Sequence, residues 1–244
     1  MKNKSIVKIL VPVFFLLIGC NYQIRQPENA SKSLMFVNIG IPKGFGIKKG
    51  SIMGEDGEII QTSYKTKPHN IRHGIFLFAN LDAGNYEIRS IYAETVRTTS
   101  GNTTSWQSMY LELQDADKKL YMPVKEGEVV YLGNIRFINK NSREKEFSNI
   151  AAQLKVQVSD LSKGIITEAA LIGGKKKANL GRVIVLRLDH PAIIGEQASL
   201  KLEELFLKQV FPAAGKGEKI QPGSWEEKVS RRLQEISEHL SRLK

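Results

Sequence analysis

Residues 81–88, which read LDAGNYEI, and residues 126–133, which read EGEVVYLG, decide the fold that the sequence predicts. The first stretch places turn residues, including a Gly84 able to take a positive φ, directly before an alternation of apolar and polar side chains. The second turns at its first glycine and then places apolar residues at alternate positions. Alternation is typical of a strand with one buried face. We therefore expect Tyr86 and Tyr131 to face the core.

Further strand signals lie on both sides of these two stretches. Apolar or alternating runs between turn residues predict strands at 34–39, 51–53, 58–64, 74–80, 104–113, 120–124, 150–158, 165–172 and 180–188. The alternation over 150–158 is the most regular of them, whereas the polar residues 139–149 predict a loop. The Gly- and Lys-rich residues 40–51 also predict a loop between strands. They do not form a phosphate-binding loop, since no frame of them fits the GxxxxGK[ST] motif.

Two glycine-containing features refine this strand pattern. Residues 54–57, which read GEDG, predict a hairpin turn. Gly133 interrupts the alternating run Val129, Tyr131, Ile135 and Phe137, which indicates a bulge or a close approach of another group to the backbone.

The spacing of apolar residues changes from two to three or four after Gly195, which predicts an amphipathic helix over Glu196–Phe211. Residues 224–227, SWEE, form a capping box that opens a last helix. The apolar stripe of this helix comprises Trp225, Val229, Leu233, Ile236, Leu240 and Leu243. The stripe packs either on the strands or on a partner, and the sequence leaves both alternatives open.

The patterns at 81–88 and 126–133 resemble those of the prealbumin-like β-sandwich domains of bacterial lipoproteins. The resemblance covers about residues 33–138 and implies a fold without implying catalytic residues. The predicted fold class is mainly β, an antiparallel β-sandwich of prealbumin or immunoglobulin type over residues 34–190. Two amphipathic helices within residues 196–244 follow it.

The first twenty residues have the features of an export signal. Three lysines precede an apolar run, Ile9–Ile18, which is broken only by a proline. A membrane-spanning helix needs about 20 apolar residues, so this run is too short to remain as an anchor. A basic start followed by a short apolar segment is typical of a cleaved signal peptide.

The end of the apolar run, Leu17-Ile18-Gly19-Cys20, resembles the lipobox of bacterial lipoproteins. The resemblance implies cleavage between Gly19 and Cys20 and attachment of membrane acyl chains to Cys20. Residues 1–19 would then be the signal peptide and residues 20–33 a lipidated tether. The predicted location is the bacterial cell envelope at the outer membrane, since the residue after the cysteine is Asn21 and not the retention signal Asp. The alternative is an ordinary signal peptide in which Cys20 is incidental.

The basic charge of the chain has two interpretations, an acidic partner or plain solubility, and the basic residues are dispersed along the sequence. The formal net charge is +11, and removal of the leader with its three lysines leaves +8. This excess favours an acidic polysaccharide or protein, and no feature indicates specific binding of nucleic acid. Lys175, Lys176 and Lys177, at the tip of the hairpin expected between 165–172 and 180–188, are the candidate contacts. The alternative is a solvated turn.

No motif in the sequence predicts catalysis or a cofactor. His69 and His73 have the spacing of a helical zinc pair, but Pro68 and Gly74 bracket them, so no metal site is predicted. The GxSxG and HExxH motifs are absent, and the only cysteine is assigned to lipid. The hypothesis is a lipoprotein with a non-enzymatic binding or structural role. A surface-exposed adhesin for host or matrix molecules is the alternative, and an envelope enzyme is the third.

Overall fold

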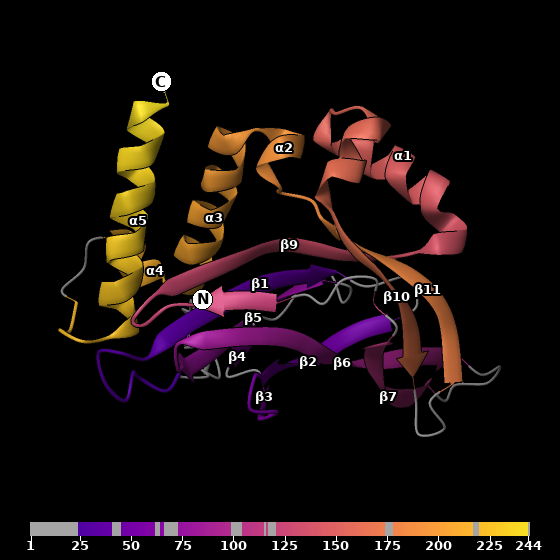
Figure 1. The fold of residues 1–244 in the computed structure, drawn as a ribbon, viewed down its shortest axis with the longest axis horizontal. Coiled ribbons are helices and arrows are strands. Elements are labelled where there is room, and N and C mark those ends of the chain that lie inside the picture. Colours follow the sequence, from indigo (N-terminus) through magenta and orange to yellow (C-terminus); the bar gives the residue numbers. More distant parts are fainter. Residues whose placement is uncertain are drawn as a thin grey trace, which may run out of the picture.

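A computed structural model describes most of the chain after the predicted leader. The described residues are 24–40, 45–61, 64–65, 73–98, 104–114, 116, 121–173, 178–216 and 220–243. In this part of the chain the strands form a strongly curved sheet, and the helices lie together on one side of it (Figure 1).

Eleven strands are present among the described residues. They are β1 Ser33–Gly40, β2 Phe45–Gly54, β3 Ile59–Gln61, β4 Tyr64–Lys65, β5 His73–Leu81, β6 Gly84–Thr98, β7 Thr104–Gln114, β8 Tyr121–Val124, β9 Val129–Asn139, β10 Ile165–Gly173 and β11 Ala178–Arg187. The predicted strands near 34–39, 74–80, 104–113, 165–172 and 180–188 are therefore confirmed. The prediction of a loop over 40–51 is wrong from Phe45 onward, where β2 begins; residues 41–44 lie outside the described residues.

The helices follow β9 in the chain. They are η1 Lys140–Ser142, α1 Arg143–Leu154, η2 Val158–Gly164, α2 Pro191–Ile194, α3 Glu196–Val210, α4 Pro212–Lys216 and α5 Trp225–Arg242, of which η1 and η2 are 3-10 helices. The two C-terminal helices predicted from the sequence correspond to α3 and α5. No helix within the described ranges is both long enough and apolar enough to cross a bilayer.

The sheet differs from the expected sandwich of two antiparallel sheets. Ten of the described strands form one hydrogen-bonded path in the order β3-β2-β6-β7-β10-β11-β9-β1-β5-β4, and β8 joins the same sheet by pairing with β6. The described pairs are antiparallel except β1 with β9, which run parallel. The pairing of β7 with β10 joins the two halves of the path. Edge strands expose unpaired backbone N–H and C=O groups, and the pairing of β7 with β10 satisfies those groups on both strands. The alternation of apolar residues in the sequence does not predict which edges pair.

The concave face of the sheet encloses one apolar core. Side chains from β1, β2, β5, β6, β8, β9, β10 and β11 meet there, so the sheet curls around its own interior. Tyr86 belongs to this core and is 6% exposed, as predicted. On β1, Met35, Val37 and Ile39 face this interior, whereas Leu34 and Phe36 face the helices.

The helical face holds the second core and settles the placement of the last helix. Trp225, Val229 and Ile236 of α5 are fully buried against β1 and β5, together with Leu207 of α3. The stripe of α5 therefore packs on the sheet, which is one of the two alternatives left open by the sequence. Leu243, just beyond the helix, is exposed.

Tyr131 lies on the opposite face of the sheet from Tyr86, which corrects the prediction that both share one core. Its ring stacks on Phe36, with centroids 4.8 Å apart, and contacts the helical core. The cause is Gly133, where the register between β1 and β9 shifts. A bulge adds one residue and thereby exchanges the faces of all residues beyond it. Ile135, after the bulge, consequently faces the interior while Tyr131 does not.

The predicted strand over 150–158 is wrong, and so is the loop over 139–149. After Asn139, the last residue of β9, the chain forms η1 and α1, and residues 155–157 then lead into η2. Phe147, Ile150 and Ala151 are buried and Leu154 packs beside them, a spacing of three, one and three residues that places all four on one helical face. The alternation of apolar and polar residues over 150–158 does not include Phe147, so within that stretch the helical period is not visible.

Two predicted hairpins are confirmed. In the turn between β2 and β3, Gly57 has φ +84° and Gly54 N–H donates to the Glu58 carbonyl at 2.9 Å. β10 and β11 form the second hairpin, whose tip, residues 174–177, lies outside the described residues. Gly84 begins β6 without the positive φ that the sequence suggested, and Asn80 at φ +61° takes a left-handed conformation instead.

Candidate functional site

The site residues predicted from the sequence fall outside the described part of the structure. This applies to Gly19, Cys20 and the three lysines at 175–177, as well as to His69 and the side chain of His73. Within the described ranges, no three His, Cys, Asp or Glu side chains gather in an arrangement that could hold a metal ion. The structure adds a different candidate, a hollow between two turns of the sheet.

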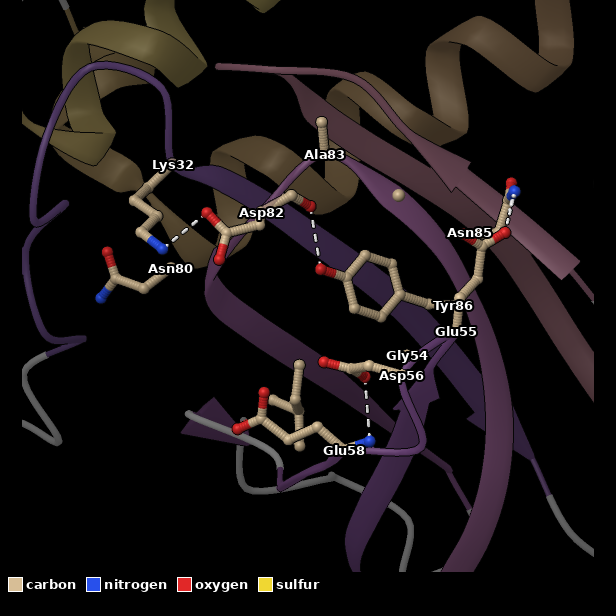
Figure 2. A pocket seen from close by; sticks show the side chains of 12 residues that line it. Lys32, Gly54, Glu55, Asp56, Glu58, Asn80, Asp82, Ala83, Asn85 and Tyr86 are labelled. Carbon is tan, nitrogen blue, oxygen red and sulfur yellow. Dashed lines mark hydrogen bonds and ion pairs between the residues drawn. The ribbon is translucent and has the colours of Figure 1, made fainter.

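This polar hollow has a volume of about 430 Å³. It lies between the β2–β3 turn, residues 54–58, and the β5–β6 turn, residues 82–84 (Figure 2). Its lining comprises Lys32, Gly54, Glu55, Asp56, Glu58, Ile60, Asn80, Asp82, Ala83, Gly84, Asn85 and Tyr86. The two turns meet because β2 pairs with β6, whose first residues follow the β5–β6 turn.

Hydrogen bonds and one ion pair fix the side chains around the polar hollow. Lys32 Nζ lies 2.7 Å from Asp82 Oδ1, and the lysine side chain is largely buried. Asn85 Nδ2 donates to Glu55 Oε1 at 2.6 Å, and Glu58 N–H donates to Asp56 Oδ1 at 2.9 Å. These contacts, drawn in Figure 2, hold both turns in place without a ligand.

Tyr86 forms the inner wall of the hollow. Its hydroxyl donates to the Asp82 carbonyl at 2.8 Å. Burial raises the pKa of Tyr86, and the charges of Asp82 and Asp56 raise it further. The phenol therefore stays neutral at physiological pH and serves as a hydrogen-bond donor that positions the β5–β6 turn.

The charge of the hollow is negative although the chain as a whole is basic. Four carboxylates line it, from Glu55, Asp56, Glu58 and Asp82, against the single cation of Lys32. Unlike charges attract across such a cleft, so the hollow suits a cationic or hydrogen-bond-donating group. A second hollow of about 370 Å³ shares Gly54, Glu55 and Asn85 with it and ends at the exposed ring of Tyr121.

The polar hollow adjoins the N-terminal segment of the domain. Asn80, one of its lining residues, accepts a hydrogen bond from Glu28 N–H at 3.0 Å through its side chain. Lys32 belongs to both the hollow and this segment. The described part of the predicted tether, residues 24–33, is thus in contact with the domain.

A buried polar cluster lies behind the Gly133 bulge. Asp189 is fully buried, and its Oδ1 accepts from Asn134 N–H at 2.9 Å and from Arg187 Nε at 3.1 Å. Asp189 Oδ2 and the Tyr131 hydroxyl are buried without a hydrogen-bond partner of ordinary geometry among the described residues. Burial raises the pKa of Tyr131, and the nearby charge of Asp189 raises it further. Through Asn134 N–H and Arg187 Nε, Asp189 holds β9 to the end of β11.

Sequence reasoning missed the polar hollow because its two turns are far apart in the chain. Each turn carries a visible signal, acidic residues next to glycine at 54–57 and at 82–84. Their proximity depends on the pairing of β2 with β6, which the alternation does not specify. Comparison of the chain with protein-family models, with curated proteins and with solved structures gives no match.

Proposed function

We propose that this chain is a lipid-anchored protein of the bacterial envelope, at the outer membrane, with a non-enzymatic role in binding. The observation that carries the proposal is Cys20, the only cysteine, at the end of a short apolar run that follows a basic start. One acyl chain binds a membrane only marginally, whereas two or three chains, at about 0.8 kcal/mol for each buried methylene, hold firmly.

The polar hollow supports the binding part of the proposal. Its walls are fixed by hydrogen bonds before any ligand arrives, and fixed walls reduce the entropy lost on binding. Its excess of carboxylates favours a ligand that presents a basic group, such as an amine or a guanidinium. This preference differs from the prediction made from the sequence, which was an acidic partner in contact with the basic loop at residues 175–177.

Metabolic labelling with radioactive palmitate tests the anchor. We expect the wild-type protein to take up label and Cys20→Ser to take up none, because the sulfur is the point of attachment. A matched control is Ser5→Cys, Cys20→Ser, which restores one thiol at a position without a lipobox. Label in this double variant, or no label in the wild type, would contradict the proposal.

Protease treatment of intact cells separates the two versions of the binding role. An envelope protein that faces the periplasm stays intact until the outer membrane is opened. Cleavage on intact cells would instead identify the outward-facing adhesin. We favour the periplasmic version because the polar hollow adjoins the segment nearest Cys20, whereas a site for large host molecules needs access away from the membrane.

A further inference from the structure

The N-terminal segment is fastened to α5 and to β5 by several independent contacts. Trp225 Nε1 donates to the Arg25 carbonyl at 2.8 Å. Lys228 Nζ donates to the carbonyls of Ala30 and Lys32 at 2.7 and 2.6 Å. The side chain of Ile24, the first described residue, packs into the helical core. The chain is therefore part of the folded body from Ile24 onward.

Three residues lie between the predicted lipid-bearing Cys20 and Ile24, so the chain makes four residue-to-residue steps from one to the other. An extended chain spans at most about 3.3–3.6 Å per residue, so Ile24 can lie no more than about 14 Å from the lipidated residue. If all of residues 20–33 were free, their reach would be about 45 Å. Because residues 24–33 dock on the domain, the domain can lie much less far from the lipidated residue than a free tether of residues 20–33 would allow.

Three segments form the edge of the domain at this point, which we name the anchor edge: residues 24–31, 125–127 and 221–223. Gly127 N–H donates to the Ser31 carbonyl at 2.8 Å, and residues 221–223 precede Ser224, the N-cap of α5. Figure 1 shows these segments together at the left, at the opposite end of the long axis from α1.

The surface of the anchor edge is polar and suits a head-group layer more than the hydrocarbon. The side chains of Arg25 and Lys125 are 81% and 83% exposed, and glutamates lie beside them. Exposed cations near a membrane are attracted to anionic lipids. Glu28 lies 3.2 Å from Arg25 and Glu128 lies 3.8 Å from Lys125, so this attraction is moderate. The acyl chains on Cys20 must supply the main attachment.

We propose that the anchor edge rests against the lipid head groups of the membrane that holds Cys20, with the α1 end of the domain directed away from the membrane. This inference rests on the proposed lipidation. It also places the polar hollow beside the membrane surface, since Lys32 and Asn80 join the hollow to the docked segment. The ligand of the hollow would then be met within or next to the head-group layer.

Energy transfer from single cysteine labels to the membrane tests this orientation. Lipidation consumes the thiol of Cys20, so an introduced cysteine becomes the only reactive one. The donor is placed at Gln221→Cys on the anchor edge or at Glu144→Cys on α1, both exposed positions. The lipidated full-length protein is reconstituted into phosphatidylethanolamine and phosphatidylglycerol vesicles with a rhodamine head-group acceptor.

We expect transfer from position 221 to exceed that from position 144 by about twofold or more, because a folded chain of this size is roughly 45 Å across. Glu126→Cys and Ser159→Cys form a second near and far pair for the case in which either first variant fails to fold. Equal transfer from both ends, or stronger transfer from the α1 end, would overturn the orientation.

Two controls separate the sources of failure. The mass of the purified protein reports lipidation, so an unlipidated protein overturns both this inference and the proposed function, whereas a lipidated protein with equal transfer overturns only the orientation. A flexible Gly/Ser linker of about 20 residues inserted before Ile24 has a root-mean-square span of about 25 Å. The linker should narrow the difference in energy transfer between positions 221 and 144. An unchanged difference would show that the short connection between Cys20 and Ile24 does not set the orientation.

Discussion

At the scale of single residues, Gly133 has more effect on the fold than its size suggests. Its φ of +111° is a conformation that other residues rarely adopt. A Cβ at this position would lie 2.5 Å from Arg187 Nε and 2.7 Å from Asp189 Oδ1. The same residue makes the bulge that places Tyr131 and Ile135 on different faces. The sequence allowed prediction of the bulge, but not of the exchange of faces that follows from it.

Gly133→Ala should destabilise the domain by about 3–5 kcal/mol, since the strain of a positive φ and the overpacking against Arg187 and Asp189 add. Gly181→Ala is the matched control. Gly181 has φ +102°, but a Cβ there would meet only Asn139 Nδ2 at 4.0 Å, so the expected cost is about 1–3 kcal/mol of strain. Urea unfolding of the domain compares the two. Equal costs would show that the Arg187–Asp189 contact is unimportant.

Two tyrosines provide a matched test of the hydroxyl groups. Tyr86→Phe removes a hydrogen bond to the Asp82 carbonyl and should cost about 1 kcal/mol. Tyr131→Phe removes a buried hydroxyl that lacks a partner of ordinary geometry among the described residues, so its cost near pH 7 should be smaller. Thermal melting of both variants checks this order. A larger cost for Tyr131→Phe would mean that its hydroxyl pairs firmly with Asp189.

The same tyrosine gives a prediction for alkaline pH. Burial, followed by the charge of Asp189, raises the pKa of Tyr131 in the folded state. The unfolded tyrosine ionises near its ordinary pKa of about 10, so the stability linked to this group is present below that pH and is lost as pH rises above it. The wild type should therefore lose up to about 1.4 kcal/mol more per pH unit above 10 than Tyr131→Phe. Parallel stability curves for the two proteins would contradict the assignment.

At the scale of elements, strands and capped helices could be predicted and a short internal helix could not. The prediction of α5 succeeded because Ser224 and the apolar stripe mark its start and its buried face; the Ser224 hydroxyl accepts from Glu227 N–H at 3.3 Å. Glu227 in turn accepts from Gly223 N–H at 2.6 Å, and not from Ser224 as a regular capping box would have it. The helix α1 was missed because its apolar residues also alternate over 150–158, and packing against β11 decides between the two periods.

The docking of the N-terminal segment on α5 can be tested at Lys228. Lys228→Met keeps the length of the side chain but leaves the Ala30 and Lys32 carbonyls without their charged donor. We expect a loss of about 2–4 kcal/mol in stability or, where the segment detaches locally, faster hydrogen exchange in residues 24–33. Lys201→Met on the exposed side of α3 is the control. Unchanged stability and exchange in Lys228→Met would contradict the docking.

At the scale of the whole molecule, the strands could be predicted and their assembly could not. Periodicity assigns a buried face to each strand, but the single curled path depends on pairs such as β7 with β10, which lie far apart in the sequence. The polar hollow follows from the same long-range pairing and could not be anticipated from either turn alone. The leader is the reverse case, because its proposed function rests on local sequence alone and its residues lie outside the described ranges.

The most direct test of the lipoprotein proposal is the mass of the N-terminal peptide of the protein purified from its own cells. The account predicts a chain that begins at Cys20, with a mass raised by a diacylglyceryl group and, where the cell adds it, an amide-linked acyl chain. Trypsin should release this peptide at Arg25. A mature chain that begins at any other residue, or an unmodified Cys20, would contradict the account.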